Sequence, residues 1–404
     1  MFQRIQNLAI LALASVSFAQ NLSSLSDTLN TEGLTCFLNL TETLVSSSSG
    51  AALVEALSNG TYTILALSND ACASVTTTNE TLLGEVLSYH ILKGRFDDSS
   101  SPVNFTSATS PNHTIGHTLL NGSDDGFPEA LAWTQENGGI SFLNQPNNAN
   151  ISVTKCIAVN GTTIDLCVIN GVLTIPGTTS SAIAASNNTQ SLNGLIDNIS
   201  VLSPNGTTNE TLGQFLDGQQ GCTIFAPDDT AVSAVSSALP ALESNGSTTL
   251  VTLILNHILN GTTLYSTQIT NGLNLTTAAG ESITFTTNST GIFVKVGNTT
   301  AQIIQSDIIT SNCVLHIINN IFVDTNSNPS AASSAYASAT SAAAQQTAET
   351  GAITATTTGS SGGSSTSTSS STSNGAEALP VVSRSYMTAL ATVVSFVVFG
   401  AYLV

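Results

Sequence analysis

The residues most suited to chemistry are two histidines four positions apart, His113 and His117. On a helix this spacing would place both imidazoles on one face, as in zinc proteases that carry a glutamate next to the first histidine. Here Thr114 stands in the place of that glutamate, and Pro111 and Gly116 disfavour a helix. The pattern gives little support to a metal centre, and we predict no metal site.

Three pairs of adjacent aspartates are the other candidates for catalysis: Asp97-Asp98, Asp124-Asp125 and Asp228-Asp229. Each pair sits in loop-like sequence, where aspartate is typical of turns and helix caps rather than of an acid and a base held apart across a substrate. No phosphate-binding glycine loop is present. We therefore expect no catalytic residues, no cofactor and no enzymatic activity.

Six cysteines remain, and no Cys-x-x-Cys spacing supports the competing interpretation as a metal site. If residues 160–163 form a four-residue hairpin loop, Cys156 falls directly opposite Cys167 on the neighbouring strand. The second half of the chain contains two cysteines, and two others are left for the first half. The predicted disulfides are Cys156 with Cys167, Cys222 with Cys313, and Cys36 with Cys72.

Both ends of the chain carry targeting signals. Residues 1–19 combine one basic residue with a short apolar run, which predicts a cleaved signal peptide, the alternative being an uncleaved anchor helix. At the other end, small residues precede a spacer and an apolar run without a basic tail, which is the order of a GPI-attachment signal. We predict attachment at Asn374, or at Ser373 or Gly375, and removal of residues 375–404. A plain membrane span is the competing interpretation.

Composition limits the partners of the mature chain. The formal net charge is −19, and the four basic residues between the ends are scattered, so they cannot neutralise the phosphates of a nucleic acid. Charged residues make up only 8% of the chain, whereas about eighteen Asn-x-Ser/Thr sequons predict a surface solvated by sugar. The predicted N-glycosylation sites include Asn39, Asn59, Asn79, Asn104, Asn121, Asn160, Asn205, Asn245, Asn274 and Asn298.

The chain between the ends divides into a tail and two domains. Residues 325–374 are mostly Ser, Thr, Ala and Gly, which predicts a disordered, O-glycosylated stalk without a core. The residues before the stalk are enough for two ordinary domains, which we place at 20–178 and 185–324.

An internal repeat supports this division. The segment 63–71, Thr-Ile-Leu-Ala-Leu-Ser-Asn-Asp-Ala, returns at 223–231 as Thr-Ile-Phe-Ala-Pro-Asp-Asp-Thr-Ala. Both copies predict a buried strand that runs into a helix start, with an Asn or Asp side chain available as the cap.

Two further blocks recur in the same order. Residues 86–94 and 253–261 each predict a helix that ends near a histidine, with a turn at the glycine. Each half then closes with a strand-like run, at 167–173 and 316–322. Helices and strands are segregated along the chain, which favours an α+β fold.

These blocks resemble the fasciclin domain. The second half carries the strand at 223–229, the pair Asn256-His257 and a closing Val-Leu-His-Ile-Ile run in the order of that family. The first half keeps Tyr89-His90 but departs from the pattern elsewhere. It has leucines at 65 and 67 where the family prefers Phe and Pro, and Cys167 where the second copy has His316.

The resemblance implies two tandem fasciclin-like domains, each a wedge of β-sheet with packed helices. It also implies a non-enzymatic role in cell adhesion or in contact with the extracellular matrix or cell wall, at the extracellular face of the plasma membrane. The expected partners are cell-surface or matrix proteins or glycans. Two other functions stay open: a structural wall glycoprotein that acts through its glycan coat, and a carrier of a small apolar ligand.

The resemblance also carries over candidate adhesion residues, because the segment around the Tyr-His pair is associated with adhesion in this family. They are Tyr89, His90, Asn256 and His257. The competing interpretation is structural: a histidine at a helix end, between apolar neighbours, commonly hydrogen-bonds backbone carbonyls.

Overall fold

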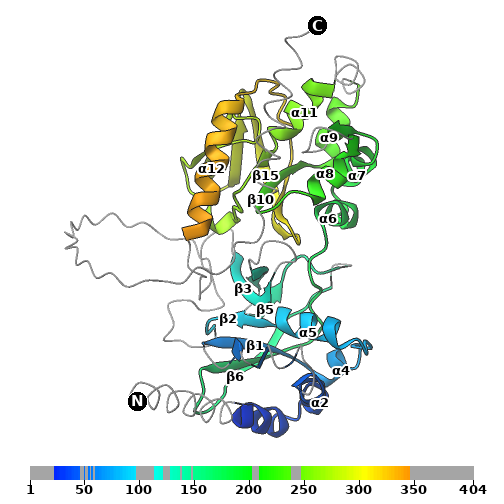
Figure 1. Ribbon diagram of the computed structural model, residues 1–404, viewed down its shortest axis with the longest axis vertical. Coiled ribbons are helices and arrows are strands. Elements are labelled where there is room, and N and C mark those ends of the chain that lie inside the picture. The colour runs from blue at the N-terminus through cyan, green and yellow to red at the C-terminus, as the bar shows by residue number, and fades with distance from the viewer. Residues whose placement is uncertain are drawn as a thin grey trace, which may run out of the picture.

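The computed structural model contains two seven-stranded sheets, one in each half of the chain (Figure 1). Their strand orders are β5-β4-β3-β2-β1-β7-β6 and β11-β10-β16-β15-β14-β13-β12. The structure describes residues 22–45, 50, 53–54, 56–57, 60–96, 113–121, 128–136, 139–146, 149–202, 209–237 and 247–345.

Each sheet contains a parallel pair of strands, which one further strand separates from an edge of the sheet. β1 (Tyr62–Leu67) runs parallel to β7 (Ile164–Ile169), and β10 (Cys222–Pro227) runs parallel to β16 (Cys313–Ile318). Every residue of these four strands is buried. Strands covered on both faces are nearly continuous in apolar residues, and the repeated segments form buried strands of this kind, as predicted.

The register of the two pairs shows that the halves are copies of one arrangement. Leu65 lies opposite Cys167 in the first sheet, as Phe225 lies opposite His316 in the second. Cys167 therefore occupies the position of His316, as the sequence comparison of the closing strands indicated.

A helix and a short antiparallel strand follow in each domain. α5 (Glu80–Tyr89) begins at Asn79, whose side chain accepts backbone hydrogen bonds from the first turn, and α11 (Ser247–Leu255) is its counterpart. Both helices end next to the histidine that occurs in each copy of the repeat, as predicted. The chain then turns at Gly94 and Gly261, where φ is 103° and 69°, a region that glycine adopts without strain.

The remaining elements complete the sheets and their covers. In Figure 1, helices α6 to α9 lie on one side of the second sheet and α12 lies on the other. Their bounds are β2 Ile91–Lys93, β3 His113–Asn121, β4 Pro128–Glu136, β5 Gly139–Phe142, β6 Val153–Ala158, β8 Ser200–Leu202, β9 Asn209–Thr211, β11 Ile258–Leu259, β12 Asn274–Thr276, β13 Ser282–Asn288, β14 Gly291–Val296, β15 Thr299–Ile309, α2 Thr35–Val45, α7 Gln190–Ile196, α8 Leu212–Asp217 and the 3-10 helix η2 Ser266–Gln268.

The helix that follows each repeat strand is capped differently in the two domains. Before α9 (Asp229–Val235), the Asp228 side chain caps the helix, as predicted. Before α4 (Asn69–Cys72), the cap is Ser68 and not the predicted Asn or Asp. Asn69 is already engaged, because its amide hydrogen-bonds two backbone groups at the start of α2.

One prediction about the tail was wrong. Within residues 325–374, expected to be disordered, the structure has the helix α12 (Pro329–Gln345), which packs beside β12. Asn328 caps its first turn, and the following proline and many alanines favour a helix start and its continuation. The ring of Tyr336 lies against Gly261, where a Cβ atom would come within 2.9 Å of the ring. Residues 346–374 of the expected stalk lie outside the described residues.

The boundary between the domains also differs from the expected one. α6 (Thr179–Ala185) lies before the predicted start of the second domain at residue 185, yet its Ile183 belongs to the second domain's core. Thr179 donates a hydrogen bond to Asn312 at 3.0 Å, which joins the start of the helix to the turn before β16. The second domain therefore begins at α6.

No helix within the described residues is long and apolar enough to cross a membrane. The segments predicted to be the signal peptide (1–19) and the removed C-terminal segment (375–404) both lie outside the described residues.

Candidate functional site

The histidine at the end of α5 is fully buried and uses both of its ring nitrogens. His90 Nδ1 lies 2.7 Å from the carbonyl oxygen of Val86, and its Nε2 accepts a hydrogen bond from the backbone N–H of Leu173 at 3.0 Å. Since a carbonyl only accepts and a backbone N–H only donates, the ring is neutral with its proton on Nδ1. It joins the end of the helix to the chain that leaves β7.

The second domain repeats this arrangement. His257 Nδ1 lies 2.8 Å from the carbonyl oxygen of Leu253, and its Nε2 accepts from the backbone N–H of Phe322 at 3.0 Å. Burial lowers the pKa of His257, and equally that of His90, from 6.5 to about 4. Both rings are therefore uncharged at neutral pH.

The residues before the two histidines also point into the protein. Tyr89 is 2% exposed and donates its hydroxyl to the carbonyl oxygen of Ala130 at 3.2 Å. Burial raises its pKa far above the ordinary value. Asn256 is fully buried; its amide donates to the carbonyl oxygen of Asp324 at 2.9 Å, and its oxygen accepts from the Thr277 hydroxyl at 2.8 Å.

All four side chains carried over as adhesion candidates are thus buried and hydrogen-bonded within the protein. The structural interpretation of the two histidines, as residues that bond backbone carbonyls, agrees with the geometry. A partner could not touch these side chains while the domains stay folded. Their role here is to hold the helix ends against the closing segments.

The paired histidines at 113 and 117 do not form a metal site. Both lie on the strand β3, where four residues span roughly 13 Å, so their rings cannot share an ion. Within the residues that the structure describes, no group of three or more His, Cys, Asp or Glu side chains could hold a metal.

His113 has a different partner, which the sequence did not reveal. Its Nδ1 lies 2.7 Å from a carboxylate oxygen of Asp307, a residue of the other domain. Asp307 is fully buried and also accepts hydrogen bonds from the backbone N–H of Ser266, at 2.7 Å, and from its hydroxyl. The backbone N–H of Asp307 donates to His316 Nδ1 at 3.2 Å.

The electrostatics of this cluster favour a charged carboxylate. Burial by itself raises the pKa of Asp307, but the hydrogen bond to His113, the electrostatic interaction with His316 and the hydrogen bonds from Ser266 together outweigh this effect, so that the net shift of the pKa is downward. Burial lowers the pKa of His316, although the negative charge of Asp307 acts to raise it. The cluster thus holds a buried negative charge of the second domain against a histidine of the first.

Apolar contacts surround the hydrogen bond between His113 and Asp307. Ile115, Ala130 and Ala132 of the first domain pack with Tyr265 and Val314 of the second in one buried cluster. The two domains are therefore docked through β3 and β4 on one side and η2, β15 and β16 on the other.

Backbone geometry at the junction is unusual. Asn144 and Asp307 are the two described non-glycine residues with positive φ, at 58° and 59°. They contact each other, because the Asn144 amide donates to the carbonyl oxygen of Asp307. Non-glycine residues keep left-handed conformations only where surrounding contacts hold them. Their presence here indicates that the contacts at the junction hold the backbone in place.

The aspartate pairs behave as turn and cap residues where the structure describes them. Asp228 caps α9, and Asp229 accepts a hydrogen bond from the backbone N–H of Ser191 at 2.5 Å. The pairs at 97–98 and 124–125 lie outside the described residues.

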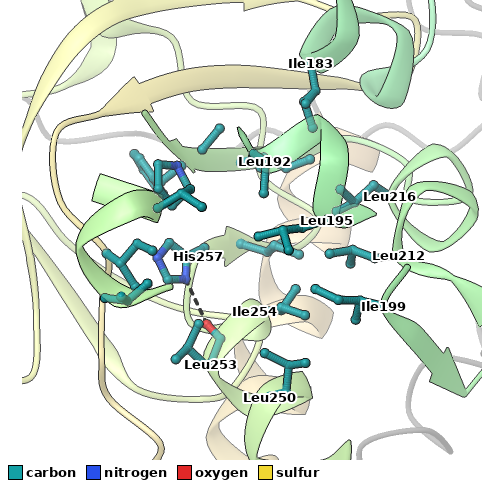
Figure 2. A pocket seen from close by; sticks show the side chains of 18 residues that line it. Ile183, Leu192, Leu195, Ile199, Leu212, Leu216, Leu250, Leu253, Ile254 and His257 are labelled. Atoms are coloured by element: carbon teal, nitrogen blue, oxygen red, sulfur yellow. Dashed lines mark hydrogen bonds between the residues drawn. The ribbon is translucent and has the colours of Figure 1, made fainter. Parts of the chain in front are cut away.

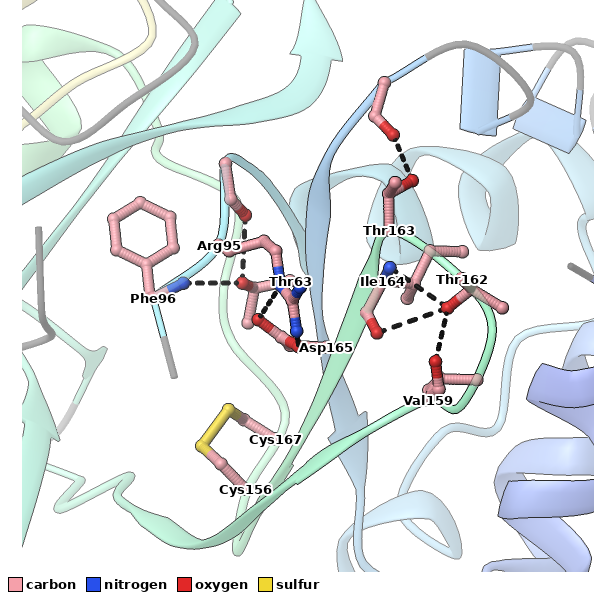
Figure 3. A network of polar contacts seen from close by, with 12 residues as sticks. Thr63, Arg95, Phe96, Cys156, Val159, Thr162, Thr163, Ile164, Asp165 and Cys167 are labelled. Carbon is pink, nitrogen blue, oxygen red and sulfur yellow. Dashed lines mark hydrogen bonds and ion pairs between the residues drawn. A yellow bond between two sulfur atoms is a disulfide. The ribbon is translucent and has the colours of Figure 1, made fainter. Parts of the chain in front are cut away.

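All three disulfides in the structure join the predicted partners. Cys156 pairs with Cys167 across the hairpin of β6 and β7, and the others are Cys36 with Cys72 and Cys222 with Cys313. Figure 3 shows the first of these beside a partly buried ion pair, in which Arg95 Nε donates to Asp165 at 2.8 Å. This pair ties the chain after β2 to β7.

The predicted glycosylation sites are accessible wherever the structure describes them. Asn59, Asn104, Asn205 and Asn245 lie outside the described residues, as do the predicted anchor residues Ser373, Asn374 and Gly375. The exposed sites are Asn39, Asn79, Asn121, Asn160, Asn274 and Asn298.

Comparison with known proteins identifies one part of the chain. No curated protein sequence matches it. Among solved structures, a FAS1 domain pair from the insect cell adhesion molecule Fasciclin I is similar, with 16% identity, coverage of 71% of this chain and 97% of that chain, and a TM-score of 0.32. The family model of the fasciclin domain matches residues 198–324, which contain the whole second sheet. Residues 198–324 are therefore similar to the fasciclin domain family.

Proposed function

We propose that this protein is a non-enzymatic adhesion glycoprotein of the cell surface, held to the outer face of the plasma membrane by a GPI lipid. The fasciclin match over residues 198–324 carries the proposal, because domains of this family are typical of extracellular and adhesion proteins. The partners we propose are surface or matrix proteins or glycans.

The covalent chemistry of the chain supports an extracellular location. All six cysteines are paired, and disulfides persist in oxidising compartments. Six of the ten named sequons lie at exposed positions in the folded domains, where glycan can be attached without disturbing the core.

The docked domains favour a contact that uses both of them. A linker would let the domains move independently, whereas the hydrogen bond between His113 and Asp307 and an apolar cluster fix one against the other. The adhesive surface we propose is therefore exposed and is presented by a two-domain unit, with the buried histidine segments as its internal support.

A domain replacement tests this function against the glycan-coat alternative. Cells that do not aggregate would display either the full chain or a version with residues 20–324 replaced by an unrelated folded domain on the same tail. We expect the full chain alone to increase attachment to cells or matrix. Equal attachment by both versions would favour a structural wall glycoprotein that acts through its glycans.

Release by phospholipase C tests the anchor separately. We expect the enzyme to release intact protein from the surface and to leave a version with a transmembrane helix in place of residues 375–404 attached. Protein that resists release would instead favour a plain membrane span and leave the adhesion proposal standing.

A further inference from the structure

The second domain contains an apolar hollow between β10 and the helices that cover it. Its cavity volume is about 90 Å³, and all of the empty space within the concavity, open solvent included, amounts to about 670 Å³. Figure 2 shows Leu195 of α7, Leu212 and Leu216 of α8, and Leu250 and Ile254 of α11 around this space. Its walls thus come from five helices, α6 to α9 and α11, and from the strand β10.

The walls of the hollow offer water almost no hydrogen-bond partners. A cavity of about 90 Å³ is large enough to hold water, but a buried water needs two to four polar partners. His257 is the one titratable side chain on the wall, and both of its nitrogens are engaged with Leu253 and Phe322. The hollow therefore offers a ligand hydrocarbon contact and almost no hydrogen bonds.

The rim of the hollow is apolar as well. Leu192, Leu195, Leu253 and Ile254 line it and are only partly buried. Protein interiors leave few voids larger than a water molecule. Covering the exposed aliphatic side chains around such a void with hydrocarbon removes apolar surface from water, which is favourable. The hollow and its rim together fit one chain of methylene groups, with the last carbons of the chain in the hollow and the rest along the rim.

Charge restricts the head group of such a ligand. Residues 185–324 contain nine Asp and Glu but a single Lys or Arg, Lys295. Lys295 lies on β14, which is not among the walls of the hollow. A fatty acid anion would meet a negatively charged domain with no cation beside the site, so an uncharged head is favoured.

We propose that this hollow is a binding site for the alkyl chain of an uncharged single-chain amphiphile, such as a fatty alcohol. The chain enters between α7 and α11 with its methyl end innermost, and the hydroxyl head stays in solvent. This is a site additional to the adhesive surface, and its test does not depend on adhesion.

Calorimetric titration of the full secreted chain with 1-dodecanol tests the site. We expect saturable binding of one molecule per chain, at least tenfold weaker in Leu195→Trp, which fills the space, and in Val235→Phe, a milder change at the half-exposed rim. Leu82→Trp is the matched control, because Leu82 is 43% exposed on a helix of the other domain, and it should bind like the natural chain. Thermal unfolding checks that each variant is folded.

Two other probes make the result decisive. Dodecanoate should bind at least tenfold more weakly than 1-dodecanol, and equal affinity would overturn the charge argument. Benzene binding without 1-dodecanol binding would show a packing void of the kind found in other apolar cores, and it would overturn the proposal. Unchanged 1-dodecanol affinity in a folded Leu195→Trp variant would overturn it as well.

Discussion

The Nε2 atom of His257 accepts a hydrogen bond from the backbone N–H of Phe322 at 3.0 Å, and the two rings stack with centroids 4.7 Å apart. One side chain thus fastens the end of α11 to the segment that follows the last strand. Because Phe322 is fully buried, this contact attaches the end of α11 to the hydrophobic core of the second domain.

Replacing His257 with alanine should destabilise the second domain by about 3–5 kcal/mol. The change leaves the buried N–H of Phe322 and the carbonyl of Leu253 without side-chain partners, at about 1–3 kcal/mol for an unsatisfied group, and it opens a cavity against the Phe322 ring. Urea unfolding measures the loss, with the exposed Leu82→Ala as control. A loss below 1 kcal/mol would mean that the histidine is incidental to the fold.

The two buried histidines predict loss of stability in mild acid. Their folded pKa is about 4 and the ordinary value is 6.5, so below pH 6.5 the unfolded state takes up protons before the folded state does. Stability should be constant above pH 6.5 and fall as pH drops toward 4, by roughly 3 kcal/mol per histidine over this window. Changing His90 and His257 to Gln should flatten the profile between pH 6.5 and 4, measured by urea unfolding at each pH. A profile as steep as that of the natural chain would contradict this assignment.

Local patterns in the sequence were sufficient for the centre of each domain. The repeated strand, the helix that ends at the histidine and the hairpin at 160–163 each depend on a few adjacent residues, and the structure contains all of them. The disulfides followed from the hairpin register and from the division into two halves.

Contacts between distant residues could not be predicted in the same way. His113 and Asp307 are 194 positions apart, and neither lies in a repeated block, because their contact belongs to the docking of two domains that differ in sequence. The helix α12 was missed for another reason: a composition poor in large apolar residues predicts disorder, but its alanines also favour a helix that needs one tyrosine to pack against a neighbouring domain surface.

The contact between His113 and Asp307 predicts that the two domains unfold together. His113→Ala removes a partner from the buried carboxylate of Asp307, and we expect a loss of about 2–4 kcal/mol, since His113 is itself partly exposed. Calorimetry should then show two separate thermal transitions in place of one cooperative transition.

Asp307→Asn supplies the control for this interaction. In a double-mutant cycle the two changes should together cost about 1–3 kcal/mol less than the sum of the single changes, because each removes the same contact. Additive losses would show that the histidine and the aspartate act independently.

The two strand-pairing disulfides should contribute unequally to stability. Cys222 and Cys313 are 91 positions apart, whereas Cys156 and Cys167 are 11 apart. In the chain-entropy model the longer loop restricts the unfolded state more, so the 222–313 disulfide should contribute about 5 kcal/mol and the 156–167 disulfide about 3 kcal/mol.

Replacing both cysteines of a pair with alanine and measuring urea unfolding of the oxidised protein compares the two disulfides directly. Cys156 lies on the edge strand β6 and is partly buried, whereas Cys222 and Cys313 are both buried, so the packing lost with the sulfur atoms also favours a larger loss for the 222–313 pair. An equal or larger loss for the 156–167 pair would mean that native-state packing around Cys167, at the position where the second domain has a histidine, outweighs the restriction of the unfolded chain.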